Sequence, residues 1–273
     1  MKSFGATLFL VAIILLSVLP SLREEAARRE IVQQAEDVAS EIQNQPPQRS
    51  EQSGEVRTLN GPWRFSTQEL QSLVNGMPPR RRHFYYTWSQ NNGLEMTGSA
   101  SGVDRNAWFV NSFLVGFKPF DTDTVWQPLA TLALRKGYIL DHELYGPRMA
   151  EIWQNSRQGF LYSRGDCEDH AIVLADWLIA MGHDARVVLG KHRDSGHAWV
   201  VLFKDGKEYL LEATTKRRPT SIRDFQLAAL SPDYRPMYQF DRDHFWVNSG
   251  SEFTTKYRDA KWQKRSVFTR DRS

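Results

Sequence analysis

The chain of 273 residues contains a single cysteine, Cys167. One thiol cannot form an intramolecular disulfide, and it cannot supply the several thiolates of a zinc–cysteine or iron–sulfur site. The hydrophobic fraction of 41% and the charged fraction of 25% are those of a globular protein, so disorder is excluded as the main state. Cys167 is therefore a buried core residue, a reactive group or the site of an intermolecular bond.

The charges of the chain nearly balance. Its 35 lysines and arginines against 32 aspartates and glutamates give a net charge of +3. A protein that binds nucleic-acid phosphates usually has a strong basic excess. We therefore expect no nucleic-acid partner.

Residues 3–22 carry no charged side chain. Twenty helical residues extend about 30 Å, which is the thickness of the hydrocarbon core of a bilayer. A cleaved signal peptide is the alternative, but no A-x-A-like step precedes Arg23. We predict that residues 1–22 form an uncleaved, single-pass anchor in the inner membrane. The flanking charges do not decide its orientation; by analogy with other short N-terminal anchors, we place the body in the periplasm or another extracytoplasmic space.

The remainder of the chain is expected to divide into four segments. The first is rich in helix formers and ends in a linker composition, and the last is rich in lysine and arginine. A basic C-terminal segment is either a solvated tail or a contact for anionic lipid or cell-wall polymer. The predicted segments are a helical stalk and linker (23–55), an N-terminal part of the body of unknown function (56–150), a catalytic core (151–250) and a basic tail (251–273). Within the body we expect strands near 83–89 and 107–117 and helices near 126–137 and 147–158.

The run G-D-C-E-D-H-A-I-V-L-A-D-W-L-I-A-M-G has apolar residues at helical spacing and ends at Gly182, a residue that can stop a helix. Cys167 falls in its first turn, on the apolar face, directly after Asp166 as a candidate N-cap. The helix dipole favours a thiolate there. The negative charges of Asp166, Glu168 and Asp169 disfavour it. These carboxylates are either capping groups or ligands of a hard cation such as Ca²⁺.

Three strand-like runs follow this helix, at residues 185–191, 197–203 and 208–213. The last two are separated by an Asp-Gly pair, which is the strongest short signal for a β-hairpin. If Asp205 and Gly206 are the two loop residues, His197 and Glu212 lie diagonally on one face of the sheet. The helix of Cys167 is expected to cover that same face.

A carboxylate beside an imidazole fixes the tautomer of the ring, which can then take the proton of a thiol. The chain supplies a nucleophile, a base and an orienting acid in the order Cys167, His197 and Glu212. A three-residue loop would instead turn Glu212 toward Lys216 or Arg217, and only the Cys–His pair would remain.

Five motifs in fixed order carry a family resemblance. They read I-W-Q-N-S, G-D-C-E-D-H-A-I-V-L-A-D-W-L-I-A-M-G, A-R-V-V-L-G, G-H-A-W-V and Y-L-L-E-A-T. As a set they resemble the transglutaminase-like superfamily, above all the bacterial transglutaminase-like cysteine peptidases. The resemblance implies an α+β, papain-like core in which the cysteine-bearing helix packs on an antiparallel sheet.

The resemblance also implies roles for individual residues. Cys167 would be the nucleophile, His197 the base and Glu212 the acid, although the family usually has aspartate at the last position. Members with the same G-D-C-E-D run are calcium-dependent, which implies Asp166, Glu168 and Asp169 as Ca²⁺ ligands. Trp153 and Gln154 resemble the segment beside the site, and Gln154 is a candidate oxyanion donor.

The sequence therefore predicts a membrane-anchored cysteine peptidase or amidase that acts on a protein or peptide outside the cytoplasm. The thiolate attacks an amide carbonyl, His197 protonates the leaving amine, and water resolves the acyl-enzyme; this chemistry itself requires no cofactor. Two alternatives use the same residues differently. A transglutaminase resolves the acyl-enzyme with an amine, and a catalytically inactive domain only binds or scaffolds, against which an intact Cys–His–acid set argues.

Overall fold

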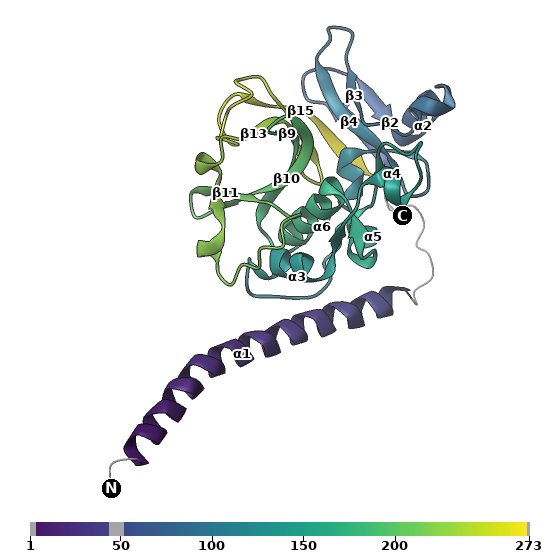
Figure 1. Cartoon of the computed structure of the whole chain (residues 1–273). Helices are drawn as coiled ribbons and strands as arrows, with labels where there is room; N and C mark the ends of the chain where they lie inside the picture. Colours follow the sequence, from purple (N-terminus) through teal and green to yellow (C-terminus); the bar gives the residue numbers. More distant parts are fainter. Residues whose placement is uncertain (1–3, 44–51, 272–273) are drawn as a thin grey trace. The chain divides into compact units, whose positions relative to one another are not determined.

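The computed structural model describes residues 4–43 and 52–271 and separates the chain into two compact units, one before and one after residue 45. Helix α1 (Phe4–Gln43) forms the first unit and contains the helix predicted for residues 23–45 (Figure 1). No helix within the described ranges is both long and apolar enough to cross a membrane. The anchor expected at residues 3–22 lies almost wholly where side chains are outside the described part, so it stays a prediction.

The second unit is an α+β body built on a nine-stranded sheet whose neighbouring strands are all antiparallel. The strand order is β12-β11-β10-β9-β13-β14-β15-β1-β2 (Figure 1). Its strands are β1 (Gly54–Thr58), β2 (Arg64–Ser66), β9 (Asp184–His192), β10 (Ser195–Lys204), β11 (Lys207–Leu211), β12 (Gln226–Leu227), β13 (Tyr234–Phe240), β14 (His244–Asn248) and β15 (Trp262–Arg270).

Smaller elements surround this sheet. A second sheet contains β3 (Tyr86–Ser89), β4 (Glu95–Gly102), β5 (Ala107–Phe109) and β7 (Ile152–Trp153), and β6 (Gly137–Tyr138) pairs with β8 (Arg164–Gly165). The helices are α2 (Thr67–Asn75), α3 (Gln127–Arg135), α4 (Asp141–Leu144), α5 (Ser156–Leu161) and α6 (Cys167–Ala180). Short 3₁₀ turns are η1 (Pro79–Arg81), η2 (Val110–Phe113), η3 (Ile222–Asp224) and η4 (Ala228–Leu230).

The helix expected at 147–158 is wrong in its first half. Ile152 and Trp153 form β7, which pairs with β4, and α5 begins only after Asn155, whose side chain caps it. The strand expected at 107–117 ends at Phe109 and continues as η2. In both segments the tertiary pairing overrides the local apolar pattern.

The hairpin between β10 and β11 has the predicted register. Lys204 pairs with Lys207, and Val200 pairs with Leu211. Asp205 and Gly206 have φ values of 52° and 71°, as a two-residue turn with both residues in the left-handed region requires. The alternative three-residue loop is thereby excluded.

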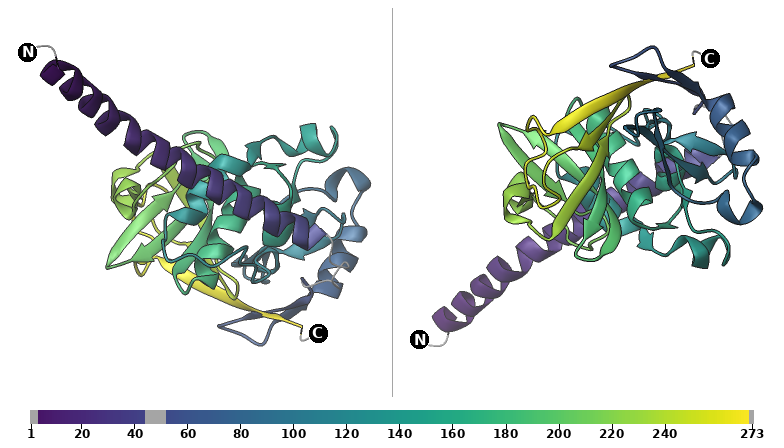
Figure 2. Two further views of the ribbon diagram at one scale, coloured as in Figure 1. Left: turned by 90° about the horizontal axis from the view of Figure 1, so that it is seen from below. Right: turned by 90° about the horizontal axis from the view of Figure 1, so that it is seen from above.

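The basic C-terminal segment, expected as a tail, is a strand of the main sheet. β15 lies between β14 and β1, and it runs beside the β1–β2 hairpin in Figure 2. Trp262, Ser266 and Phe268 are buried, while the intervening lysines and arginines lie toward the surface. A count of charges does not reveal this alternation of buried and exposed residues. The alternation allows a basic segment to form a strand.

Helix α6 packs on β9 and β10, with α3 and α5 beside it (Figure 1). It covers the sheet face that contains Val200. Val200 pairs with Val187 and Val187 pairs with Phe240, so the three residues share one face. Phe240 stacks on Trp153 of β7, which lies beside α6. On the opposite face, Trp199, Val201 and Phe203 pack with Tyr257 and Trp262. The expectation that α6 covers the face of His197 is therefore wrong, since hairpin register determines which residues share a face and not which element covers it.

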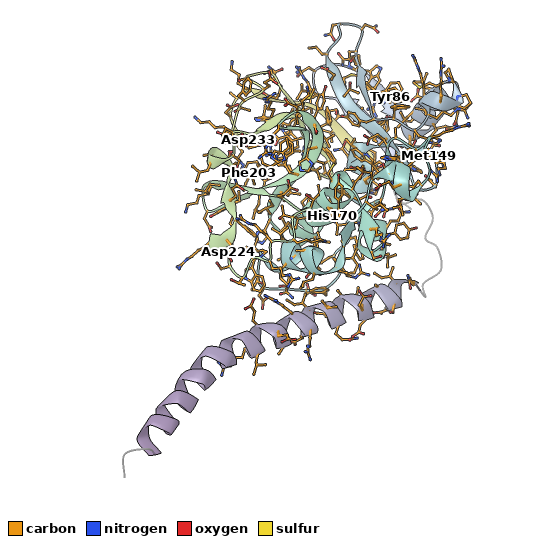
Figure 3. All side chains as sticks on the ribbon, in the orientation of Figure 1. Tyr86, Met149, His170, Phe203, Asp224 and Asp233 are labelled. Atoms are coloured by element: carbon orange, nitrogen blue, oxygen red, sulfur yellow. The ribbon has the colours of Figure 1, made fainter. Side chains whose placement is uncertain are left out.

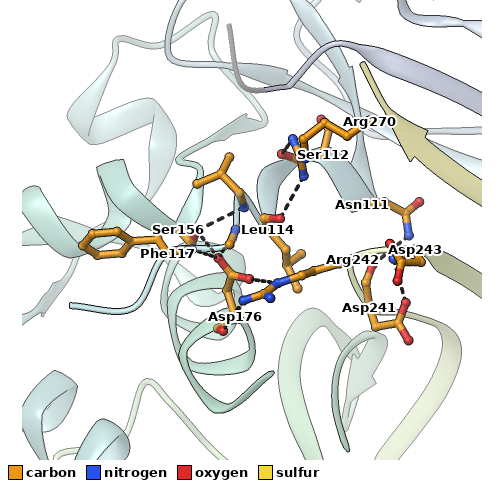
Figure 4. A network of polar contacts seen from close by, with 12 residues as sticks. Asn111, Ser112, Leu114, Phe117, Ser156, Asp176, Asp241, Arg242, Asp243 and Arg270 are labelled. Atoms are coloured by element: carbon orange, nitrogen blue, oxygen red, sulfur yellow. Dashed lines mark hydrogen bonds and ion pairs between the residues drawn. The ribbon is translucent and has the colours of Figure 1, made fainter. Parts of the chain in front are cut away.

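A buried carboxylate anchors the middle of α6 (Figure 4). Asp176 Oδ2 accepts hydrogen bonds from the backbone N–H groups of Gly116, at 2.9 Å, and Phe117, at 2.8 Å. Its Oδ1 forms an ion pair with Arg242 Nε at 2.6 Å. Ser156 Oγ donates to the same carboxylate. The helix is thus held to loops from both earlier and later parts of the chain.

Candidate active site

Cys167 is the first residue of α6 and is partly buried. It lines a cleft of about 400 Å³ together with His197, Trp153 and Glu151. The cleft lies where the first turn of α6 meets the beginning of β10, so the helix and the sheet each contribute one reactive side chain to it. The structure therefore brings together the predicted nucleophile and the predicted base.

His197 and Glu212 form a hydrogen-bonded pair, with 2.7 Å between Nε2 and Oε2. The second carboxylate oxygen, Oε1, accepts from the N–H of Thr214 at 3.1 Å and from its hydroxyl at 2.7 Å. Burial alone would raise the pKa of Glu212, but the hydrogen bond and charge of His197, together with Thr214, lower the pKa to about 2. With Nε2 held by an ionised carboxylate, Nδ1 is the ring nitrogen that can accept the thiol proton.

Lys216, one of the two cations that could have paired with Glu212, is engaged elsewhere. Lys216 Nζ donates to the backbone carbonyl of Lys136. A different histidine, His170, lies on α6. It is 1% exposed and lies inside the body (Figure 3). Burial lowers the pKa of His170 to about 4, and its Nδ1 faces the carbonyl of Asp166 at 2.7 Å. Two histidines, His142 and His197, line the cleft, and His197 is the one that is hydrogen-bonded to Glu212.

Tyr234 completes this group and was not found from the sequence. Its hydroxyl donates to Glu212 Oε2 at 2.9 Å, the same oxygen that meets His197. Its ring stacks on His192, with 4.2 Å between centroids and 9° between planes. The residue lies on β13, whose pairing with β9 brings Tyr234 opposite His192. A local sequence pattern does not predict this pairing, because three strands, β10, β11 and β12, lie between β9 and β13 in the chain.

The thiol lies in a strongly negative environment. Burial and the charge of Asp166 raise the pKa of Cys167 to about 12, although hydrogen bonds from the Ala198 backbone and to Glu168 oppose the shift. The helix dipole is thus outweighed, and the neutral thiol is the favoured form when no cation is bound.

Five carboxylates gather beside Cys167. Ligand oxygens of Asp141, Glu151 and Glu168 lie within 4.8 Å of one another, and so do those of Asp141, Asp166 and Asp169. Burial and the neighbouring charges raise the pKa values of Asp141 and Glu151. Asp141 and Glu151 were not predicted, because they precede the cysteine motif and reach it only through the fold.

Several oxygens of this cluster have no protein partner. Among the described residues, four buried carboxylate oxygens lack a hydrogen bond: Asp141 Oδ1, Asp166 Oδ1, Glu168 Oε1 and Asp169 Oδ2. Leaving a buried acceptor unpaired costs free energy. Six to eight oxygen ligands are what Ca²⁺ takes, with neutralisation of the carboxylate charges. The donor set therefore fits a hard cation such as Ca²⁺.

Trp153 and Gln154 behave differently although they are adjacent. Trp153 lines the cleft. Gln154 is fully buried, and its amide nitrogen donates to Tyr145 Oη at 3.0 Å and to the Arg164 carbonyl at 2.9 Å. Its Oε1 accepts from Lys136 Nζ at 2.8 Å. Gln154 is therefore a buried structural residue, and the expectation of an oxyanion donor at this position is wrong.

Residues 151–268 match the family model described as the CEP76 peptidase-like domain. The predicted relationship to transglutaminase-like peptidases is confirmed. The matched segment contains Cys167, His197 and Glu212 as well as Tyr234. No curated protein sequence matches the chain.

Solved structures of LapG from Legionella pneumophila are also similar to this chain. The calcium-bound form is 15% identical with a TM-score of 0.37, and the match covers 72% of this chain and 96% of that one. The EGTA-treated form is 14% identical with the same TM-score of 0.37, and the match covers 67% of this chain and 86% of that one.

Proposed function

We propose that the protein is a cysteine peptidase or amidase in which Cys167 is the nucleophile, His197 the general base and Glu212 the orienting acid. The observation that carries this proposal is the His197–Glu212 hydrogen bond of 2.7 Å at the cleft that contains Cys167. The match of this segment to a peptidase-like family model supports it.

In the proposed reaction, Cys167 Sγ attacks the carbonyl carbon of an amide while its proton passes to His197 Nδ1. Glu212 stabilises the imidazolium that forms. The imidazolium then protonates the leaving amine, and the C–N bond breaks to give a thioester. A water molecule that loses its proton to His197 attacks the thioester, which releases the acid product and restores the thiol.

A calcium ion forms part of the proposal. Asp166, Glu168, Asp169 and Asp141 would hold it through their unpaired buried oxygens, and Glu151 would join them because it lies close to Asp141 and Glu168. When bound, the ion neutralises the negative charge around the cysteine. The chain's own carboxylates would then no longer hold the thiol in its neutral form.

The location of the enzyme follows from the sequence alone. We propose that residues 3–22 anchor the chain in the membrane and that the body acts outside the cytoplasm on a protein or peptide. Carbonate extraction of membranes provides the test: the full chain should remain in the pellet. A mature N-terminus between Pro20 and Glu30 would show a cleaved signal instead.

Alkylation of Cys167 by iodoacetamide near pH 6, with Ca²⁺ or EGTA present, tests the proposed chemistry. We expect rapid labelling with Ca²⁺ and slow labelling with EGTA, and the His197→Gln variant should label slowly in both. Equal rates for wild type and His197→Gln would overturn the base assignment. Product analysis with an added lysine analogue distinguishes hydrolysis from transamidation, and hydrolysis is the expected outcome.

A further inference from the structure

Four large apolar side chains are exposed, two at the cleft and two at a second hollow. Tyr138 and Leu140 are 50% and 40% exposed, and Leu144 and Tyr162 are 37% and 42% exposed. Exposed apolar residues that occur singly need no explanation, but a contiguous group on a soluble body commonly marks a binding surface. We call these four residues the apolar strip.

The apolar strip joins the cleft to a second hollow of about 420 Å³. Tyr138 and Leu140 line the cleft beside Cys167. Leu144 and Tyr162 line the second hollow. The other residues of that hollow are Val103, Tyr145, Leu161, Ser163 and Arg164. Its lining is therefore mostly apolar, with a single cationic side chain.

Two elements connect the hollows physically. Helix α4 begins directly after its N-cap residue Leu140 and ends at Leu144, and four helical residues advance about 6 Å along the axis. β6 pairs with β8, and the N–H of Gly137 donates to the carbonyl of Ser163 at 2.6 Å. Tyr138 at the cleft and Ser163 in the second hollow thus belong to one paired unit. Helix α4 and the β6–β8 pair therefore connect the backbone of the two hollows.

We propose that the apolar strip and the second hollow bind an apolar side chain of the substrate polypeptide, two to four residues from the bond cut at Cys167. The inference rests on the proposed peptidase function. An extended chain advances about 3.3 Å per residue, so the rise of about 6 Å along α4 corresponds to about two residues, and the reach into the hollow adds up to two more. Apolar walls favour an apolar side chain over a charged one because a charge would be desolvated there.

Peptides with a reactive centre can test this without a known substrate. The probes are nine-residue glycine–serine peptides whose central residue is a chloroacetylated diaminopropionate. Attack by Cys167 Sγ forms a thioether and releases chloride, while the thiol proton passes to His197. Each of the eight flanking positions carries either one leucine or one asparagine in turn. The rate of labelling is followed by intact-protein mass in the presence of Ca²⁺.

We expect leucine at one position, two to four residues from the centre, to accelerate labelling about tenfold over asparagine. Leu144→Asp should remove this preference. Leu230→Asp is the matched control, because Leu230 is 71% exposed and lies outside the strip, and it should keep the preference. Labelling by iodoacetamide should be the same in all three proteins.

Three results would overturn the proposal, and they differ in meaning. Equal rates for every leucine position, with normal iodoacetamide labelling, would overturn the docking site alone. Absence of iodoacetamide labelling in the wild type would remove the proposed peptidase function as well. If Leu144→Asp dissociates a dimer in light scattering without changing peptide preference, the strip is a contact between two copies of the chain.

Discussion

Helix α6 carries buried carboxylates at its beginning and in its middle, and the two places are built differently. In the middle, Asp176 has every oxygen paired, with two backbone N–H groups, a serine hydroxyl and Arg242 around it. At the beginning, Asp166, Glu168 and Asp169 each have a buried oxygen without a partner among the described residues. The same helix thus contains a satisfied acid and a group of unsatisfied ones.

The difference separates carboxylates that the protein itself satisfies from carboxylates that leave room for a cation. A buried carboxylate with complete partners holds elements together, and losing one partner leaves an uncompensated charge. Several unpaired carboxylates in contact lower the stability of the empty protein, and they persist where a cation or a reaction uses them. Glu212 belongs with the satisfied group, since His197, Thr214 and Tyr234 hold both of its oxygens.

The largest expected effect comes from the first residue of α6. Cys167→Ala should reduce peptidase activity by about a thousandfold or more, because the nucleophile is removed. The fold should stay intact, since a small side chain replaces another small one in the first turn. Activity on any identified substrate and the far-UV circular dichroism spectrum check both halves. Retained activity would refute the proposed mechanism.

Asp176→Asn tests the satisfied acid. We expect a loss of about 3 kcal/mol in the free energy of unfolding, because Arg242 loses its partner and an amide nitrogen can replace an oxygen opposite two N–H donors. Urea denaturation measures the change. Asp243→Asn is the control, since this exposed residue should alter stability by less than about 0.5 kcal/mol. Equal effects of the two substitutions would show that the side-chain contacts of Asp176, drawn in Figure 4, contribute little.

The two kinds of carboxylate should also differ in pH dependence. The pKa of Asp141 is raised from 3.8 to about 9, so its contribution to stability is present below pH 3.8 and is lost as the pH rises toward 9. The pKa of Glu212 is lowered from 4.5 to about 2, so its contribution is present above pH 4.5 and is lost as the pH falls toward 2. In EGTA, stability should therefore fall by about 4 kcal/mol between pH 5 and pH 8, because a difference of one bound proton is worth about 1.4 kcal/mol per pH unit. Thermal unfolding with excess Ca²⁺ should abolish this decline, and a decline unchanged by Ca²⁺ would argue against the cation site.

Asp141→Asn should have the opposite sign to the same substitution at Asp176. In EGTA at pH 8 we expect a gain of about 1 kcal/mol, because folding no longer requires the carboxyl group of Asp141 to take up a proton. The asparagine oxygen can still accept the hydrogen bond from the Ile152 N–H. The rise in melting temperature on adding Ca²⁺ should become smaller than in the wild type. Calorimetry measures both changes, and an undiminished Ca²⁺ response would remove Asp141 from the ligand set.

Tyr234→Phe is expected to have the smallest effect. The substitution removes one hydrogen bond to Glu212 Oε2 and keeps the ring on His192. A single hydrogen bond is worth about 1 kcal/mol, so alkylation of Cys167 should slow by about fivefold. The pH at which the rate is half-maximal should also shift, since Glu212 is then less firmly held. A change in thermal stability without any change in the pH profile would indicate a purely structural role.

Short-range physics explains what the sequence could predict. The Asp-Gly turn fixes the register of β10 and β11 through the backbone preferences of two residues, and so brings His197 and Glu212 onto one face. The start of α6 at Cys167 follows from local spacing, and Asp166 occupies the N-cap position as predicted, although its side chain makes no capping hydrogen bond. The nucleophile, the base and the acid were therefore all found as candidates before any tertiary contact was known.

Only the tertiary structure decided how the remaining parts come together. Both faces of the main sheet are apolar, so local patterns could not tell which face α6 covers. Strand pairing placed Tyr234 on the acid, and it turned the basic C-terminal segment into β15. Asp141 joined the carboxylates of α6 through the fold between them. Such contacts depend on the packing of segments that are distant in the chain. The energy of that packing cannot be predicted from the residue pattern of one segment alone.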